Sequence, residues 1–270
     1  FNNKSRETFK IRDMKNRTYI IGIIFFVMIC FMATETKAQK PEDLLVKANT
    51  LYNESAYDSA AVVYESIINK GYSSATLFYN LGNTYYKIGN YPLAIYYYEK
   101  SLKLDPKNED TKHNIEIAQA FISDKIESVP EFFIKTWWKN ISNTFSINTW
   151  SIITLIVFGL LLISLYFYFT ARTRGLKKSM FFIGLILIIM SICSFSITIK
   201  KSNYIKGQNE GIIITPTITV KSSPSSSSVD LFVLHEGSKV KILDHADNWD
   251  KIKIANGSIG WIPSSTTIKY

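Results

Sequence analysis

Apolar residues follow several distinct patterns along the chain, and each pattern predicts a different kind of element. An apolar run comes first, from Tyr19 to Met32. The segment 41–123 carries small and aromatic side chains at helical spacing, and this pattern repeats with a period of about 34 residues. Two uncharged runs at 150–169 and 180–199 are each long enough to span a bilayer. From 211 to 270 the apolar positions alternate, which indicates strands. The chain is therefore expected to be multi-domain.

The N-terminal segment, 1–38, is typical of an export signal and not of a folded module. Residues 1–13 precede the first methionine and lack apolar periodicity, so we interpret them as sequence upstream of the true start. Residues 14–38 begin with Lys15 and Arg17, continue into the apolar run and end in small and polar residues, which predicts a signal peptide. The apolar run is shorter than the ~20 residues that span hydrocarbon comfortably, so cleavage after Ala38 is favoured over a retained helix.

The two cysteines predict no disulfide and no metal site. Cys30 and Cys193 both lie in apolar runs, without the spacing of a metal or redox motif. A lipid anchor at Cys30 would resemble the lipobox signal only with a small residue before it, and Ile29 stands there. Cys30 is therefore interpreted as part of the signal core.

The helical pattern is clearest at residues 75–108, where small and aromatic side chains alternate in a fixed order. Gly82 and Ala94 would let two helices approach closely, while larger residues fill the space beside them. The signature positions are Phe78, Leu81, Gly82, Tyr85, Tyr91, Ala94, Tyr98 and Pro106. This stretch resembles a tetratricopeptide repeat, which implies an antiparallel pair of helices.

A weaker copy of the repeat lies one period earlier, and a single helix follows the clear one. The earlier copy carries Leu44, Ala48, Leu51, Tyr57, Ala60 and Tyr64 in register. The helix at 111–121 is interpreted as a cap that covers the last apolar face. Residues 41–123 are thus predicted to form a tetratricopeptide-repeat domain of two repeats plus a capping helix.

The resemblance also implies a ligand groove, because the first helix of each pair lines the concave face in this family. The positions that it maps there are Leu45, Asn49, Tyr52, Thr76, Tyr79, Asn83, Tyr86 and Lys87. Asparagine amides can bind an extended peptide backbone through both donor and acceptor atoms, although asparagine also belongs to the general repeat pattern. Family members that grip a terminal carboxylate use basic residues where Leu45 and His113 stand here, so an aromatic and amide groove is favoured.

Three consecutive tyrosines occur in the second helix of the repeat at 75–108. Tyr96, Tyr97 and Tyr98 point in three directions on a helix, and only Tyr98 matches a core position. Tyr96 and Tyr97 are therefore the two that could be exposed.

The membrane region has a distinct distribution of charge. Trp137 and Trp138 stand among lysines before the first apolar run, which suits a membrane interface. The loop at 170–179 contains Arg172, Arg174, Lys177 and Lys178. By the positive-inside rule this loop is expected to be cytoplasmic, with transmembrane helices at 150–169 and 180–199 and both soluble modules outside.

The C-terminal segment, residues 208–270, is predicted to be a small all-β module. The expected strands are Ile212–Thr215, Thr217–Lys221, Val240–Asp244, Trp249–Ile254 and Ser258–Ile262. Asn256-Gly257 predicts a type I′ hairpin turn, which needs positive φ at both central residues. Residues 222–228 are serine-rich and are expected to form a flexible loop.

The order of motifs in this segment resembles a bacterial SH3-like domain, a small barrel. The residues that carry the likeness are Gly237, Val240, Trp249, Ile252, Gly257, Gly260, Trp261 and Ile262. Trp249 and Trp261 could form a ligand face for peptide or cell-wall glycopeptide, or could fill the barrel core. The residues leave both alternatives open.

The formal charge of +9 does not indicate nucleic-acid binding. The excess lies in residues 1–38 (+4) and 128–207 (+8), while residues 39–127 carry −3 and residues 208–270 are neutral. His113, His235 and His245 have no metal-ligand spacing, and the sequence has no phosphate-binding glycine loop. We therefore expect a protein without enzymatic activity, cofactor or metal.

The order of signal, repeats, paired membrane helices and SH3-like module resembles the BatE-type proteins of bacterial aerotolerance operons. The resemblance implies a bacterial inner-membrane protein linked to oxidative stress tolerance. It also implies partners with von Willebrand A-type (VWA) domains and a MoxR-type ATPase. The favoured function is a scaffold whose exported repeats bind envelope proteins. Alternatives are a peptidoglycan-binding protein acting through the SH3-like domain, and an envelope hydrolase for which no catalytic constellation is found.

Overall fold

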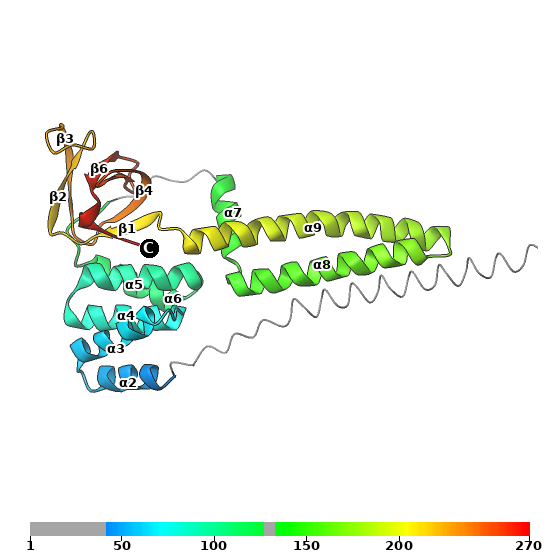
Figure 1. The fold of residues 1–270 in the computed structure, drawn as a ribbon, viewed down its shortest axis with the longest axis horizontal. Coiled ribbons are helices and arrows are strands. Elements are labelled where there is room, and N and C mark those ends of the chain that lie inside the picture. Colours follow the sequence, from blue (N-terminus) through cyan, green and yellow to red (C-terminus); the bar gives the residue numbers. More distant parts are fainter. Residues whose placement is uncertain (1–41, 127–132) are drawn as a thin grey trace, which may run out of the picture. The chain divides into compact units, whose positions relative to one another are not determined.

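The computed structural model describes residues 42–126 and 133–270. The segments interpreted as upstream sequence at 1–13 and as signal peptide at 14–38, with Cys30, lie outside the described residues. The order of elements confirms the expected fold class, with a tetratricopeptide-type helical array, two long apolar helices and a C-terminal antiparallel sheet. Figure 1 shows these elements in chain order.

The helical array consists of two antiparallel pairs and one additional helix. The pairs are α2 with α3 and α4 with α5, and α6 packs against α5. Their bounds are α2 (Glu42–Asn53), α3 (Tyr57–Asn69), α4 (Ala75–Ile88), α5 (Tyr91–Leu104) and α6 (Glu109–Gln119).

Short polar residues set where these helices begin. The side chain of Ser74 accepts a hydrogen bond from the Leu77 amide at 3.1 Å, and Asn90 and Asn108 cap α5 and α6 in the same way. Helix α4 ends at Ile88 and is capped by Gly89, whose φ of 87° is left-handed and suits glycine. The chain can therefore reverse direction sharply between α4 and α5.

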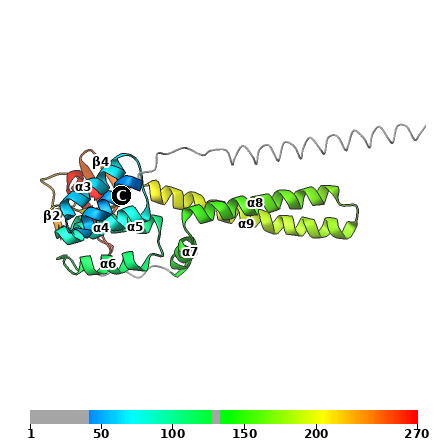
Figure 2. The ribbon, with the colours of Figure 1, turned by 90° about the horizontal axis from the view of Figure 1, so that it is seen from below.

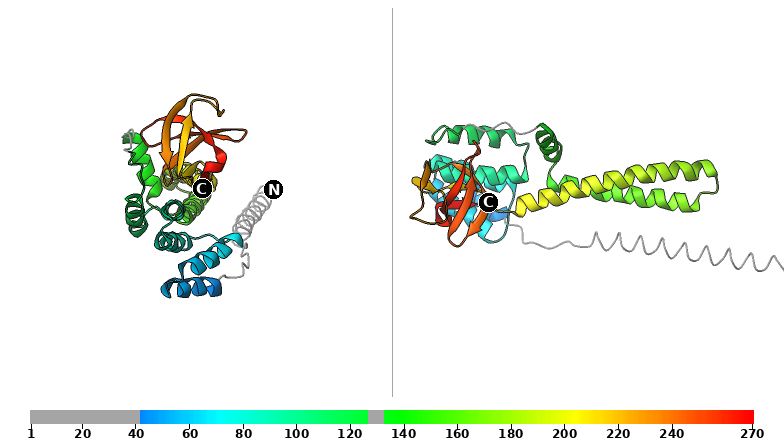
Figure 3. Two further views of the ribbon diagram at one scale, coloured as in Figure 1. Left: turned by 90° about the vertical axis from the view of Figure 1, so that its left-hand side faces the viewer. Right: turned by 90° about the horizontal axis from the view of Figure 1, so that it is seen from above.

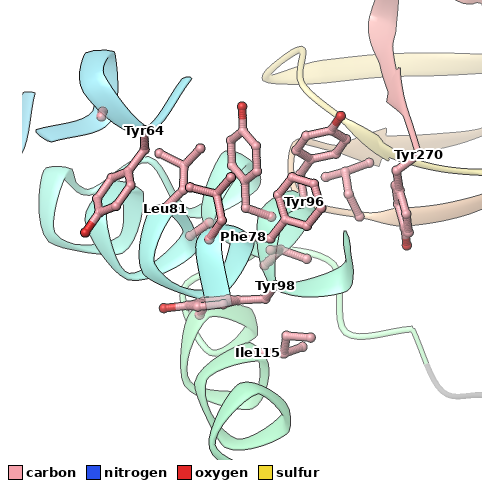
Figure 4. Packing of buried hydrophobic residues seen from close by; sticks show 14 of the residues in the cluster. Tyr64, Phe78, Leu81, Tyr96, Tyr98, Ile115 and Tyr270 are labelled. Atoms are coloured by element: carbon pink, nitrogen blue, oxygen red, sulfur yellow. The ribbon is translucent and has the colours of Figure 1, made fainter. Parts of the chain in front are cut away.

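Close contact between α4 and α5 depends on small residues, as the repeat pattern predicts. A Cβ placed on Gly82 would lie 2.5 Å from the ring of Tyr98. Ala94 is completely buried at the same contact. In Figure 4 the hydroxyls of Tyr64 and Tyr98 point to one side of the array, away from Tyr96 and Tyr270.

Helix α7 (Phe133–Asn143) precedes the two long apolar helices, α8 (Ile147–Thr170) and α9 (Arg174–Lys206). Helices α8 and α9 lie side by side (Figure 2). Within the described residues, these two are long and apolar enough to cross a membrane. Helix α9 extends beyond the expected span in both directions, because no proline interrupts its basic ends and lysine and arginine favour helices.

Small and polar residues join α8 to α9. The Ser164 hydroxyl donates to the Met180 carbonyl at 2.9 Å, and a Cβ on Gly184 would lie 3.4 Å from the Ser164 hydroxyl oxygen. The hydroxyls of Thr154 and Thr198 lie 3.3 Å apart. Contacts of this kind hold helices together in lipid, where burial of apolar surface gives little attraction between them.

The C-terminal residues form one antiparallel sheet of seven strands in the order β3-β2-β6-β5-β4-β1-β7. Figure 3 shows the C-terminal strands in yellow, orange and red. The strands are β1 (Glu210–Ile213), β2 (Thr217–Lys221), β3 (Asp230–His235), β4 (Lys239–Ala246), β5 (Trp249–Lys253), β6 (Ile259–Pro263) and β7 (Thr267–Lys269). The sequence pattern does not predict β3, whose apolar residues run consecutively, or β7, which is very short.

The turn between β5 and β6 differs from the prediction. Gly257 has a φ of 93°, but Asn256 is not among the described residues with positive φ. The amide of Gly257 donates to the Ile254 carbonyl at 3.0 Å, and the Ile254 amide donates to the Ser258 carbonyl at 3.1 Å. A longer loop with a left-handed glycine therefore replaces the type I′ turn.

The sheet and the helical array share a hydrophobic cluster. Ile212 of β1 and Tyr270 are buried in the same cluster as the side chains of α5. The rings of Tyr96 and Tyr270 meet edge to face with centroids 5.8 Å apart (Figure 4). Tyr96 and Tyr97 are buried, because the sheet covers the first and the rings of Tyr85 and Phe78 flank the second.

Candidate functional site

The concave face of the helical array contains two adjoining cavities of about 290 and 300 Å³. Helices α2, α4 and α6 supply most of their walls, and α3 and α5 contribute one tyrosine each. We call this surface the groove, defined by its lining residues Asn49, Tyr52, Asn53, Tyr64, Asn80, Asn83, Tyr86, Lys87, Tyr98, Asn114 and Ile117.

A hydrogen-bonded set of three side chains forms the floor of the groove in the first repeat. The side-chain oxygen of Asn49 accepts from the Tyr64 hydroxyl at 2.6 Å. The same oxygen accepts from Nδ2 of Asn80 on the next helix at 3.2 Å. Asn49 therefore joins α2 to α3 and to α4.

The second repeat contains the same set, displaced by one repeat along the chain. The side-chain oxygen of Asn83 accepts from the Tyr98 hydroxyl at 2.7 Å and from Nδ2 of Asn114 at 2.8 Å. Because every member recurs one repeat length later, the arrangement is a property of the repeat and not of one position.

These hydrogen bonds use the side-chain oxygens of the two asparagines and not their Nδ2 atoms. The oxygens of Asn49 and Asn83 each accept two hydrogen bonds inside the protein. Their Nδ2 atoms have no hydrogen-bond partner within the part of the chain that the structure describes. Each amide thus has two N–H donors left for a ligand, which corrects the expectation that these asparagines offer a ligand both donor and acceptor.

The tyrosine hydroxyls of the two sets remain protonated at neutral pH. Burial raises the pKa of Tyr64 to about 12, against a smaller opposing effect of Asn80. Burial likewise raises the pKa of Tyr98 well above its ordinary value. Both hydroxyls therefore stay hydrogen-bond donors, which fixes the asparagine oxygens as acceptors and orients the amides.

Aromatic rings lie beside one end of the groove, where Tyr86 contacts two rings that line a separate cavity. The ring of Tyr86 meets the rings of Tyr91 and Phe121 edge to face, at centroid distances of 5.7 and 6.2 Å. Tyr91 and Phe121 are stacked at 4.4 Å, and Phe121 is 55% exposed. An apolar side chain of a ligand would find an aromatic surface here, beside the asparagine donors.

The groove carries little charge. Among the described residues that line it, Lys87 is the only ionisable one apart from the tyrosines. His113 is exposed and does not line either cavity, and Leu45 packs against the hydrophobic cluster. A pair of cations for a terminal carboxylate is therefore lacking among the lining residues, and the amide and aromatic character remains.

The structure brings together five of the eight groove positions that the sequence predicts. Asn49, Tyr52, Asn83, Tyr86 and Lys87 line the two cavities. Leu45, Thr76 and Tyr79 do not, although the Tyr79 hydroxyl accepts a hydrogen bond from Asn114 at 3.3 Å.

Sequence reasoning missed Asn80 and Asn114, which supply the second amide of each set. A signal was present, because the separation between Asn80 and Asn114 equals the repeat length, as does the separation between Asn49 and Asn83. Comparing the two copies for repeated polar residues would have found both pairs.

The two tryptophans of the sheet are partly exposed, and neither belongs to the buried core of the sheet. Trp261 lies opposite Lys251 on the neighbouring strand, with the ammonium 5.8 Å from the ring centroid. The position that faces inward beside Trp249 is Asp250, which is completely buried.

Asp250 links three strands of the sheet. Its carboxylate lies 2.8 Å from the Lys269 ammonium of β7 and 2.8 Å from Nδ1 of His245 on β4. Burial alone would raise the pKa of Asp250, but the hydrogen bonds with Lys269 and His245 and the charge of Lys269 outweigh it and hold that pKa below its ordinary value. No group of three metal-ligating side chains occurs within residues 42–126 and 133–270.

Comparison with known proteins supports the division into two kinds of module. Residues 75–108 match the tetratricopeptide repeat family, and residues 216–268 match the bacterial SH3 domain family. The tetratricopeptide match points to protein–protein interaction.

Similarity to individual proteins is limited to part of the chain. Tetratricopeptide repeat protein 21B of Homo sapiens is 32% identical over 79 residues, which is 29% of this chain and 6% of the length of that protein. The solved structure of SycD, the type III secretion translocator chaperone of Yersinia enterocolitica, is similar over 64% of this chain and 93% of its own, with 17% identity and a TM-score of 0.29.

Proposed function

We propose that this chain is a membrane-anchored scaffold of a bacterial envelope, and that its groove binds an extended segment of a partner protein. The observation that carries the proposal is the repeated asparagine set, in which Asn49 and Asn83 line two adjoining cavities and their Nδ2 atoms have no partner among the described residues. Backbone carbonyls of an extended peptide are the natural acceptors for such donors.

The chemistry of the groove sets the kind of segment that fits. The aromatic rings at and beside one end of the groove, Tyr86, Tyr91 and Phe121, suit an apolar side chain. The scarcity of charge elsewhere disfavours a strongly acidic or basic segment. An uncharged segment with one apolar or aromatic anchor is the proposed ligand.

The proposed place of the protein is the inner membrane, with the repeats and the SH3-like domain on the outer side. Helices α8 and α9 are the proposed anchors, with the basic segment at 170–179 on the cytoplasmic side. The resemblance to BatE-type proteins adds VWA-domain proteins as partners and a link to aerotolerance. A periplasm-active reporter should be active when fused after residue 127 and silent after residue 175, and the reverse pattern would refute this topology.

The groove is tested by a change that alters its donors and not its folding. Asn83→Asp keeps an oxygen acceptor for Tyr98 and Asn114 but removes the free N–H donors. The matched control is Asn69→Asp, the same change at an exposed position at the end of α3. Affinity purification of the full chain from membranes should lose the partner with Asn83→Asp and with Tyr86→Ala, and keep it with Asn69→Asp. Retention of the partner at wild-type strength by both groove variants would exclude the groove.

A second candidate function is binding of peptidoglycan through the SH3-like domain. The match to the bacterial SH3 family and the partly exposed Trp249 and Trp261 favour it. Sedimentation of the full chain with purified peptidoglycan, compared with a Trp261→Ala variant, tests this candidate independently of the groove.

A further inference from the structure

A cavity of about 270 Å³ on the opposite side of α5 gathers basic residues from three parts of the chain. Lys100 and Lys103 come from α5, Lys206 from the end of α9, and Lys269 from β7. The other lining residues are Ser73, Phe78, Tyr96, Leu104, Ile205, Gly207, Gln208 and Tyr270. Among the described residues that line this cavity, none is an aspartate or a glutamate.

Some of the nearby positive charge is already neutralised. Lys269 pairs with Asp250 at 2.8 Å. Lys239, which lies close by, pairs with Glu99 at 2.8 Å and with Glu210 at 3.8 Å. Burial alone would lower the pKa of Lys239, but these two carboxylates outweigh it and raise that pKa.

Three lysines of the cavity have no salt-bridge partner among the described residues. Lys103 is only 6% exposed, and its ammonium donates to the carbonyls of Tyr204 and Gly207 at 3.3 and 3.1 Å. Lys100 contacts the Tyr96 hydroxyl at 3.4 Å and the Phe78 ring at 4.5 Å. Lys206 is exposed at the last residue of α9.

The environment of these lysines favours an anion. Burial lowers the pKa of Lys100 and of Lys103, because both ammonium groups have lost part of their hydration. At Lys103 the charges of Glu210 and Glu99 oppose this shift but do not outweigh it. Carbonyl oxygens and ring faces compensate only partly, since none of them carries a full negative charge. An anion in the cavity would complete the compensation, and the Ser73 hydroxyl and Gln208 amide add uncharged donors.

We propose that this lysine cavity binds a phosphate group, carried either by an anionic lipid headgroup or by a small soluble phosphate. The position of the cavity makes the headgroup a realistic source. Lys206 stands two turns of helix beyond Ile199, where the apolar run ends, and two turns rise about 10 Å. The headgroup region on one side of a bilayer is about 5–8 Å thick, so the cavity would lie at its outer limit.

The test uses the full chain in detergent and follows its thermal unfolding. One arm adds inorganic phosphate against chloride at equal ionic strength. The other adds phosphatidylglycerol against phosphatidylcholine. The site variant is Lys100→Gln/Lys206→Gln, which leaves Lys103 in place to hold the two carbonyls. The matched control is Lys241→Gln/Lys253→Gln, two exposed lysines that face each other across β4 and β5.

Wild type and control should be stabilised by at least one ligand, and the site variant should require about tenfold more of it or fail to respond. Stabilisation by inorganic phosphate identifies a soluble anion, and stabilisation by phosphatidylglycerol alone identifies the headgroup. If neither ligand stabilises the wild type, or the site variant responds as the control does, the proposal is overturned. Should the double variant fold poorly, Lys206→Gln alone is the replacement, with the same expected direction.

Discussion

The two sides of the helical array both carry tyrosines, but the α5 side packs against the rest of the chain and the groove side is open. On the groove side, the hydroxyls of Tyr64 and Tyr98 donate hydrogen bonds to the side-chain oxygens of Asn49 and Asn83. The N–H groups of the two asparagine side chains have no partner among the described residues. On the α5 side, Tyr96 and Lys103 are covered by Tyr270 and by the end of α9. The rest of the chain thus packs on the α5 side of the array, whereas the groove side keeps amide donors without a partner among the described residues.

The largest expected effect is on the covered side. Tyr96→Ala should reduce the free energy of unfolding by about 3–5 kcal/mol, because it removes a buried ring from the contact with Tyr270. Tyr86→Ala in the open groove should cost much less stability but should weaken partner binding. Chemical unfolding of the two variants beside wild type measures the difference. Equal losses would contradict the distinction between the two sides.

A smaller effect separates the structural role of the asparagine set from its binding role. Asn83→Ala should cost about 1–3 kcal/mol of stability, since the buried Tyr98 hydroxyl loses its acceptor. Asn83→Asp keeps that acceptor and should retain more of the stability. Thermal melting of both variants tests this order, and a melt of Asn83→Asp at or below that of Asn83→Ala would speak against it.

Acid should weaken the covered side through Asp124, which ties the end of the helical array to the sheet. Its carboxylate accepts from the Ser238 hydroxyl at 2.6 Å and from the His235 amide at 2.7 Å. Burial alone would raise the pKa of Asp124, but these hydrogen bonds and the His235 ring outweigh it and lower that pKa. The stabilisation is therefore complete above the ordinary aspartate pKa of about 3.9 and is lost as the pH falls through the lowered value.

The measurement for this prediction is the melting temperature of wild type and Asp124→Asn between pH 7 and pH 2. The gap between the two should be widest near neutral pH and should close in acid. A gap that grows on acidification would show that the sign is wrong.

The smallest expected effect concerns the single cation of the groove. Lys87 is exposed, so Lys87→Gln should change the stability by less than about 0.5 kcal/mol. Binding of the partner segment should weaken by at most about 1 kcal/mol, and less at high salt. Titrations at two salt concentrations, with Lys70→Gln as an exposed control, measure it. A loss of binding much larger than this would mean that the ligand carries a negative charge.

The pattern of apolar and small residues predicted the helices and strands that depend on residues close together in the sequence. Gly82 and Ala94 fit only where two helices meet, and the recurrence of the repeat placed Asn83 and Tyr86 on one face. The apolar runs predicted α8 and α9 by length alone, because a span needs about 20 apolar residues whatever surrounds it. Strands with alternating residues were equally visible, whereas β3 and β7 were not.

Tertiary structure alone decided which neighbours each side chain would have. Alternation puts Trp249 and Asp250 on opposite faces of β5 but does not say which face is inside, and only Lys269 and His245, brought from other strands, make a buried Asp250 acceptable. Likewise, Tyr96 is buried by Tyr270, which lies at the far end of the sequence. The sequence by itself determined the repeats, the apolar helices and the β module, because the spacing of apolar residues within a short segment decides which secondary structure can bury them. The covered side and the lysine cavity depend on contacts between residues far apart in the sequence, which the repeat period does not encode.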